Sequence, residues 1–217
     1  MKKLIVFDMD GTLADTSPGI LNSHRFAHKK MNRVQPKTEV LQDVIGGPLL
    51  DTYITRFDFT KTEARLAVDY YRSYYEEKGL LEAQLYPGMI EALSDLKKDG
   101  YYIGVATLKA ERFVKIMLES MGVAKYFDVI FGMDDADTRT KSQLIGMCMD
   151  AVGVDNTETI MIGDSIHDLK GAEQAGVDFI GLTYGFGFKS GERLIGYPFC
   201  DKVCDLVPLI NSMNLNM

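Results

Sequence analysis

Short apolar runs alternate with helix-length amphipathic segments along most of this chain, and no other feature restricts its possible folds as strongly. The predicted strands are Leu4–Phe7, Tyr101–Ala106, Val129–Phe131, Thr159–Ile162 and Phe179–Leu182. The predicted helices, which repeat apolar residues at i, i+3 and i+4, are Met89–Lys98, Arg112–Met121, Ser142–Val152 and Leu169–Ala175. Apolar strands joined by helices indicate a parallel sheet that is covered on both faces. We therefore predict an α/β fold with a Rossmann-like core.

A glycine follows each of these helices, before the next strand or connector. The four positions are Gly100, Gly122, Gly153 and Gly176. Helices commonly end in a left-handed residue, and glycine adopts that conformation without a steric penalty. We predict that all four are helix caps with a structural role.

Residues 16–85 interrupt the alternation, because they show helical patterns and no convincing buried strand. These patterns are Ile20–Met31, Thr38–Ile45, Leu49–Phe57 and Thr62–Lys78, with Gly46-Gly47-Pro48 between the second and the third. A helical insert of this length is typical of a separate small domain. We predict a core domain of residues 1–15 and 86–217 and an inserted helical domain of residues 16–85.

The composition, with 217 residues, 46% hydrophobic and 25% charged, is typical of globular proteins and permits an ordinary soluble enzyme. The net charge of −7 argues against a nucleic-acid surface, which needs clustered Lys and Arg. No apolar run approaches the roughly 20 residues that span a bilayer, and too few apolar residues follow Lys2-Lys3 for a signal peptide. Cys148, Cys200 and Cys204 lack a disulfide spacing, so we expect core thiols. We expect a cytoplasmic protein that binds neither nucleic acid nor membrane.

The first predicted strand ends in two acids on a glycine-containing loop, Asp8-Met9-Asp10-Gly11-Thr12. Charged residues are rare at the end of a buried strand unless they are paired, bind metal or take part in chemistry. Open α/β sheets also bind their ligands at these strand ends. Asp8 and Asp10 are therefore candidate active-site residues, although two acids in an ordinary strand-to-loop turn would look the same.

The strand Thr159–Ile162 ends in a second acidic pair, within Gly163-Asp164-Ser165-Ile166-His167-Asp168. Gly163 permits close backbone approach, and Asp164 and Asp168, four residues apart on the turn that enters a helix, can face the same space. Carboxylates from two strands offer hard oxygen ligands, which suit Mg²⁺ better than zinc. The alternative is that both acids only stabilise the helix N-terminus.

Thr107 and Lys141 are two further candidates. The segment Thr107-Leu108-Lys109 places a hydroxyl and backbone amides between a strand and a helix, which suits phosphate oxygens. A hydroxyl at such a junction is equally an ordinary N-cap. Lys141 lies at a helix start, where the macrodipole disfavours a cation, and this placement hints at a role with an anion. The alternative for Lys141 is a solvated surface lysine.

The chain resembles the haloacid dehalogenase superfamily of phosphotransferases in four signature motifs that occur in order: Asp8-x-Asp10-Gly-Thr, Thr107, Lys141 and Gly163-Asp164-x-x-x-Asp168. The resemblance covers essentially the whole chain, because the helical insert looks like the four-helix cap of that superfamily. Similarity to its phosphoglycolate phosphatase-like branch extends to Asp15-Thr16, Ile45–Leu49 and Tyr86-Pro87-Gly88. Small-molecule 5'-nucleotidases and pyrophosphatases share much of this pattern.

The resemblance implies a Mg²⁺-dependent phosphatase that acts on a small phosphorylated metabolite. Asp8 would attack phosphorus and form an acyl phosphate, and Asp10 would protonate the leaving alcohol and later activate water. Mg²⁺ would bind Asp8, Asp164 and the backbone carbonyl of Asp10. Thr107 and Lys141 would neutralise the phosphate charge. The supporting residues would be Gly11, Thr12, Leu108 and Asp168 near the phosphate, and Gly46, Gly47 and Pro48 of the cap near the leaving group.

Two other functions use a similar acidic pocket. A phosphosugar mutase forms the same acyl phosphate but transfers it to a sugar phosphate, and the sequence separates it poorly from a phosphatase. A non-enzymatic phosphoacceptor domain would have no use for the helical insert or for an acid and base at Asp10. A dehalogenase would need no leaving-group acid at that position. We expect a hydrolase that acts as a monomer or homodimer.

Overall fold

The computed structural model of the chain describes residues 1–45, 49–134 and 138–215. The chain divides into two compact units, Met1–Asp15 with Gln84–Met217 and Thr16–Ala83. The division falls at a two-stranded antiparallel sheet in which Ala14–Asp15 (β2) pairs with Gln84–Leu85 (β3). Because of this pairing, Gln84 and Leu85 belong to the first unit.

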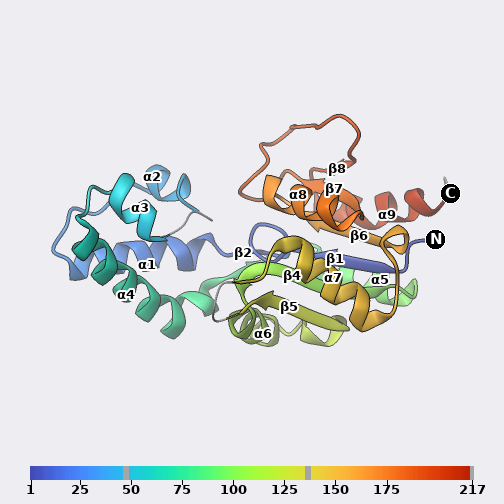
Figure 1. Cartoon of the computed structure of the whole chain (residues 1–217), viewed down its shortest axis with the longest axis horizontal. Helices are drawn as coiled ribbons and strands as arrows, with labels where there is room; N and C mark the ends of the chain where they lie inside the picture. The colour runs from blue at the N-terminus through green and yellow to red at the C-terminus, as the bar shows by residue number, and fades with distance from the viewer. Residues whose placement is uncertain (46–48, 135–137, 216–217) are drawn as a thin grey trace. The chain divides into compact units, whose positions relative to one another are not determined.

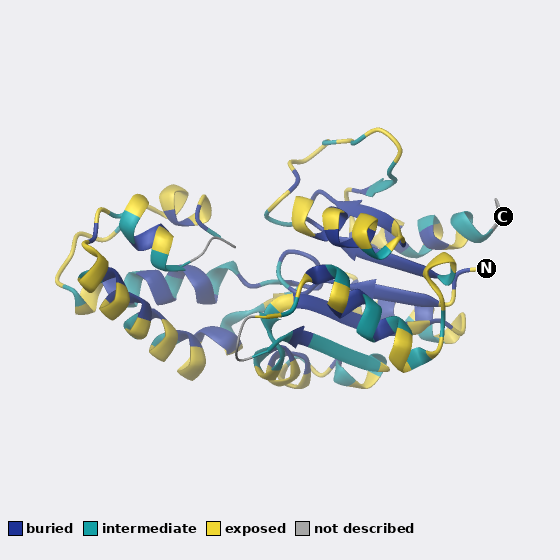
Figure 2. Ribbon diagram, viewed as in Figure 1, coloured by how far each residue is buried: buried dark blue, intermediate teal, exposed yellow. Residues whose placement is uncertain are grey.

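The first unit is built on a six-stranded sheet of order β5-β4-β1-β6-β7-β8, with neighbouring strands parallel (Figure 1). The strands are β1 (Leu4–Phe7), β4 (Tyr102–Ala110), β5 (Val129–Met133), β6 (Thr159–Gly163), β7 (Asp178–Leu182) and β8 (Phe199–Cys200). Figure 2 shows the central strands as a buried layer. The residues of β1 are apolar and fully buried, so this strand needs cover on both faces. All five predicted strands are confirmed.

Helices cover both faces of this sheet. They are α5 (Met89–Lys98), α6 (Glu111–Ser120), α7 (Lys141–Val152), α8 (Ile166–Ala175) and α9 (Leu206–Leu215), with the 3₁₀ helices η2 (Ala124–Tyr126), η3 (Asn156–Glu158) and η4 (Val203–Asp205). Val6 packs with Leu144 of α7 and Leu169 of α8. Because side chains alternate along a strand, Phe7 faces the opposite side, where it is equally buried. The predicted Rossmann-like α/β core is confirmed.

Several details differ from the sequence prediction. Helix α8 begins at Ile166, earlier than predicted, because the Asp168 carboxylate accepts a hydrogen bond from the Ser165 N–H at 3.1 Å and so starts the helix. The sequence does not predict β2, β3 or β8, since strands of two residues carry no periodicity. It also does not predict α9, which contains Pro208. Cys204 is exposed, so the expectation of a core thiol is wrong there.

The four glycines predicted as helix caps all have positive φ. The angles are 85° at Gly100, 70° at Gly122, 80° at Gly153 and 70° at Gly176. None of the helices within the described ranges is both long and apolar enough to span a membrane.

The second unit is helical. It contains α1 (Ser17–Lys30), α2 (Thr38–Gln42), α3 (Leu49–Thr55), α4 (Lys61–Glu77) and the 3₁₀ helix η1 (Gly79–Glu82). A capping box of Thr60 and Glu63 starts α4, which packs against α1. Gly19 of α1 lets η1 approach, because a Cβ there would lie 2.1 Å from the Gly79 carbonyl oxygen. Each predicted helical segment contains a helix, and Gly46-Gly47-Pro48 lie outside the described residues.

Two buried histidines of α1 lie in the aromatic core of the second unit. The His24 ring centroid lies 4.8 Å from that of Tyr71, and its Nδ1 lies 3.1 Å from the Tyr53 hydroxyl. The His28 ring centroid lies 4.7 Å from that of Phe57. Burial lowers the pKa of His24 to about 3, and the charge of His28 lowers it as well. His24 is therefore neutral in the folded unit at neutral pH.

Candidate active site

The carboxyl ends of three adjacent strands bring together predicted site residues of the first unit. Strand β1 lies between β4 and β6. Asp8 directly follows β1, Thr107 lies in β4, and Asp164 directly follows β6. Parallel strands end at the same edge of the sheet, so these buried residues gather there although they are far apart in sequence.

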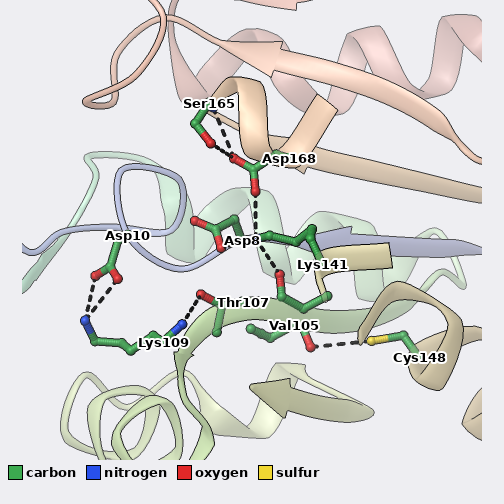
Figure 3. Close-up of polar contacts among 10 residues, drawn as sticks. Asp8, Asp10, Val105, Thr107, Lys109, Lys141, Cys148, Ser165 and Asp168 are labelled. Carbon is green, nitrogen blue, oxygen red and sulfur yellow. Dashed lines mark hydrogen bonds and ion pairs between the residues drawn. The ribbon is translucent and has the colours of Figure 1, made fainter. Parts of the chain in front are cut away.

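Lys141 is buried and contacts two of the acids (Figure 3). Its Nζ lies 2.6 Å from Asp8 Oδ1 and 2.7 Å from Asp168 Oδ1, and it donates to the Ala106 carbonyl at 3.0 Å. Gly171 of α8 makes room for this side chain, because a Cβ at Gly171 would lie 2.3 Å from Lys141 Cγ. The alternative of a solvated surface lysine is therefore wrong.

Asp8, Asp164 and Asp168 form a buried acidic cluster, in which one oxygen of each carboxylate lies within 4.8 Å of the others. Burial raises the pKa of Asp8 above its ordinary value, against the opposing effect of Lys141. Burial, together with the charge of Asp168, also raises the pKa of Asp164 to about 6. Burial lowers the pKa of Lys141, but Asp168 and Asp8 raise it more, so the lysine stays charged. The three carboxylates, two of which contact the Lys141 ammonium, supply oxygen donors that suit a divalent cation.

Asp168 has a structural contact and a site contact at once. Its Oδ2 accepts hydrogen bonds from the N–H and the Oγ–H of Ser165, at 3.1 and 2.6 Å. Its Oδ1 faces Lys141. One oxygen of Asp168 therefore stabilises the helix N-terminus, as the alternative interpretation expects, and the other belongs to the acidic cluster.

A loop that the sequence does not single out holds Asp164. Asp164 Oδ2 accepts hydrogen bonds from the N–H groups of Phe186 at 2.6 Å and Gly187 at 3.1 Å. The Phe188 N–H donates to the Asp164 carbonyl at 2.7 Å. Glycine at position 185 permits this close approach, because a Cβ there would lie only 2.3 Å from Asp164 Oδ2. The two glycines on either side of Phe186 are the only sequence signal that could have indicated this loop.

Asp10 lies on the loop after β1 and pairs with Lys109, a residue to which the sequence analysis gives no role. Lys109 Nζ lies 2.9 Å from Asp10 Oδ1 and 3.0 Å from Asp10 Oδ2 (Figure 3). Helix α6 begins at Glu111 with Ala110 as its N-cap residue, so the alternative of Thr107 as the helix N-cap is wrong. The Thr107 Oγ1 instead accepts a hydrogen bond from the Lys109 N–H at 3.2 Å.

The remaining predicted residues lie in different surroundings. Gly11 has a φ of 77°, and a Cβ there would lie 2.3 Å from Asp164 Oδ2, so only glycine fits. Its N–H donates to the Ala14 carbonyl at 3.0 Å and is thus used within the loop. Thr12 is fully buried, and its Oγ1 has no hydrogen-bond partner within the described part of the chain. Leu108 is exposed.

The sequence is similar to known proteins over most of its length. The sequence matches the family model of haloacid dehalogenase-like hydrolases over residues 5–182. It is 36% identical over 184 residues to a 5'-nucleotidase of Pseudomonas aeruginosa, a match that covers 84% of this chain and 83% of that protein.

Solved structures share the fold as well. A predicted phosphatase from Clostridium acetobutylicum has a TM-score of 0.85 at 33% identity, covering 98% of this chain and 99% of that one. A predicted phosphoglycolate phosphatase from Haemophilus somnus has a TM-score of 0.80 at 25% identity, covering 96% and 98%. These matches confirm the resemblance that the motifs indicate. The chain therefore belongs to the haloacid dehalogenase-like hydrolases, and within them it is a phosphatase.

Proposed function

We propose that this protein hydrolyses a small-molecule phosphomonoester through an aspartyl phosphate on Asp8, with Mg²⁺ as cofactor. The observation that carries the proposal is the position of Asp8, which follows the central strand, pairs with buried Lys141 at 2.6 Å and lies in one cluster with Asp164. A carboxylate can form an acyl phosphate and so divide hydrolysis into two easier steps. Asp10, two residues further on, would supply the acid and the base.

The oxygen donors of the acidic cluster fit Mg²⁺. Asp8, Asp164 and the backbone carbonyl of Asp10 would hold the ion. Two amides orient the Asp164 carboxylate through its Oδ2, which leaves Oδ1 as the ligand atom in this proposal. Asp168 would support the site through Lys141 and not as a direct ligand. The bound ion would reduce the repulsion between the Asp8 carboxylate and an anionic phosphate.

In the first half-reaction, an oxygen of Asp8 bonds to phosphorus while the bond from phosphorus to the leaving oxygen breaks. Asp10 gives its proton to that oxygen, which departs as an alcohol. Lys141 and Thr107 would bind the phosphoryl oxygens. Because Thr107 Oγ1 accepts from the Lys109 N–H, its own O–H is available to donate to the phosphate.

The second half-reaction restores the enzyme. Asp10, now a carboxylate, takes a proton from a water molecule whose oxygen attacks the phosphorus of the aspartyl phosphate. The bond between phosphorus and the Asp8 oxygen breaks, and inorganic phosphate leaves. The two steps together consume one ester and one water and release one alcohol and one phosphate.

The substrate in this proposal is a small phosphorylated metabolite. The support is the function named for two relatives, a 5'-nucleotidase and a predicted phosphoglycolate phosphatase. We further propose that the helical unit is a cap domain that closes on the substrate, and that Gly46-Gly47-Pro48 select among leaving groups. Substitutions at these three residues should then alter the order of preference among substrates.

The test is hydrolysis of a panel of phosphomonoesters by the wild type and by Asp8→Asn, with Mg²⁺ and with EDTA. The amide keeps the shape of the side chain but removes the nucleophile and one ligand, so activity should fall to background. EDTA should abolish wild-type activity, and added Mg²⁺ should restore it. Asp95→Asn, which changes an exposed acid of α5, is the matched control.

Two results would contradict the proposal. Near-wild-type turnover by Asp8→Asn would show that Asp8 is not the nucleophile. A long-lived acyl phosphate in the wild type, discharged by a sugar phosphate and slowly by water, would indicate a mutase.

A further inference from the structure

The ion pair between Asp10 and Lys109 is enclosed on the lysine side. The Lys109 side chain is 8% exposed and that of Asp10 is 29% exposed. One ammonium contacts both oxygens of the carboxylate, at 2.9 and 3.0 Å, so the contact restricts the rotation of the carboxylate as well as its position. A pair of this kind orders Asp10, the residue that the proposed reaction uses as acid and base.

Lys109 lies beside Asp10 because strand β4 is irregular at this point. The pairing of β4 with β5 shifts its register between Ala106 and Ala110, so residues 107–109 leave the regular ladder. Such irregularities redirect side chains and are common beside active sites. The same stretch carries Thr107, whose Oγ1 accepts the Lys109 N–H at 3.2 Å. The backbone therefore places Thr107 and Lys109 together.

Neighbouring residues support this irregular stretch. A Cβ at Gly132 of β5 would lie 2.6 Å from the Lys109 carbonyl oxygen, so glycine is needed for the close approach of β4. Arg139 donates to the Gly132 carbonyl at 2.9 Å and to Glu111 Oε2 at 3.1 Å. These contacts connect β5 with the start of α6 and stabilise the backbone around Lys109.

We propose that Lys109 is the positioning residue for Asp10, holding its carboxyl group where the proton reaches the leaving oxygen. The inference rests on the proposed phosphatase mechanism and adds a residue to it. Lys109 acts through Asp10 and not on the phosphate itself. Because a misplacement of about 1 Å can cost about a hundredfold in rate, loss of this contact should be visible in the first half-reaction.

The experiment compares Lys109→Met, Asp10→Ala and the double variant in single-turnover release of alcohol from aryl and alkyl phosphates. Lys109→Met should slow release by about tenfold to a hundredfold for poor leaving groups, which need the acid, and little for activated aryl phosphates. The double variant should be no slower than Asp10→Ala, because a residue that acts only through Asp10 adds nothing once Asp10 is gone. Lys109→Arg should recover part of the loss.

Further variants keep the test decisive. Lys98→Met, in an exposed pair with Asp95, is the matched control and should behave as wild type. If Lys109→Met does not fold, Gly132→Ala displaces the same backbone and should show the same dependence on the leaving group.

Different experimental results would overturn this inference and the proposed function. Equal losses on all leaving groups, losses that multiply in the double variant, or an unchanged Lys109→Met would overturn the role of Lys109 alone. A wild type that hydrolyses no phosphate ester would overturn the proposed function and this inference with it.

Discussion

At the scale of single residues, Lys141 determines the charge balance of the site. Its ammonium contacts Asp8 after β1, Asp168 of α8 and the Ala106 carbonyl of β4. Buried charges are stable only when they are paired and hydrogen-bonded, and here one cation serves two carboxylates. Lys141 should therefore matter for both stability and chemistry, and the two effects can be separated.

Lys141→Met keeps the length of the side chain and removes its charge. Breaking a buried ion pair costs about 3–5 kcal/mol, so the free energy of unfolding in urea should fall by about 3 kcal/mol or more. Phosphatase activity should be lost as well. The matched control is Lys2→Met. Lys2 precedes β1, is also buried and pairs with Asp178 at 2.7 Å, but it does not belong to the candidate site. That variant should lose stability and keep its activity, and an active Lys141→Met would show that the lysine is only structural.

At the scale of elements, the sequence predicts what is periodic and misses what depends on contacts across the fold. The bounds of β1 and α5 follow from an apolar run and a helical repeat, and the structure has the same bounds. Lys109 carries no such signal, since its partner Asp10 is 99 residues away. The glycines at 185 and 187 gain their meaning only from the approach to Asp164. Asp8 and Asp164 could be singled out because each follows a predicted strand, and Lys141 because it stands at the start of a predicted helix.

The loop of residues 185–187 should control the affinity for metal. A Cβ at Gly187 would lie 2.5 Å from the Asp164 carbonyl oxygen, so Gly187→Ala must displace the loop and its two amide donors. Supporting contacts of this kind are typically worth about tenfold to a hundredfold in metal affinity. Titration calorimetry with Mg²⁺ should show such a loss. Gly146→Ala, where a Cβ meets nothing within 4 Å, is the control and should bind as wild type. Equal affinities would mean that Asp164 needs no such support.

At the scale of the whole molecule, the two units have different kinds of core. The first has a mainly aliphatic core around a parallel sheet, with a few aromatic residues such as Phe179 and Phe188, whereas the second packs aromatic rings around His24 and His28. Burial lowers the pKa of both histidines. The unfolded chain binds protons at these positions at a higher pH than the folded unit does, so acid favours unfolding of the second unit.

His24→Phe should remove part of this acid sensitivity. The folded pKa of His24 is about 3, below its ordinary value of 6.5. The stability that the folded unit gains from a neutral His24 is therefore fully present above pH 6.5, and it is lost as the pH falls towards 3. Across that window the wild type should lose about 1.4 kcal/mol per pH unit relative to the variant. Urea unfolding followed by circular dichroism in EDTA at several pH values measures the difference. Parallel pH profiles would show that His24 is not held neutral.

The place of β1 in the centre of the sheet also has a consequence for synthesis on the ribosome. Leu4 pairs with Tyr102 on one side and with Thr159 on the other, so the strand leaves the ribosome long before either partner exists. The helical unit is continuous in sequence, from Thr16 to Ala83, and its contacts are local enough to form during translation. Closing the sheet must wait for β6, and Asp8 and Asp164 come together only then. A chain released before β6 is made would therefore contain a folded helical unit but would lack the cluster of Asp8, Asp164 and Asp168.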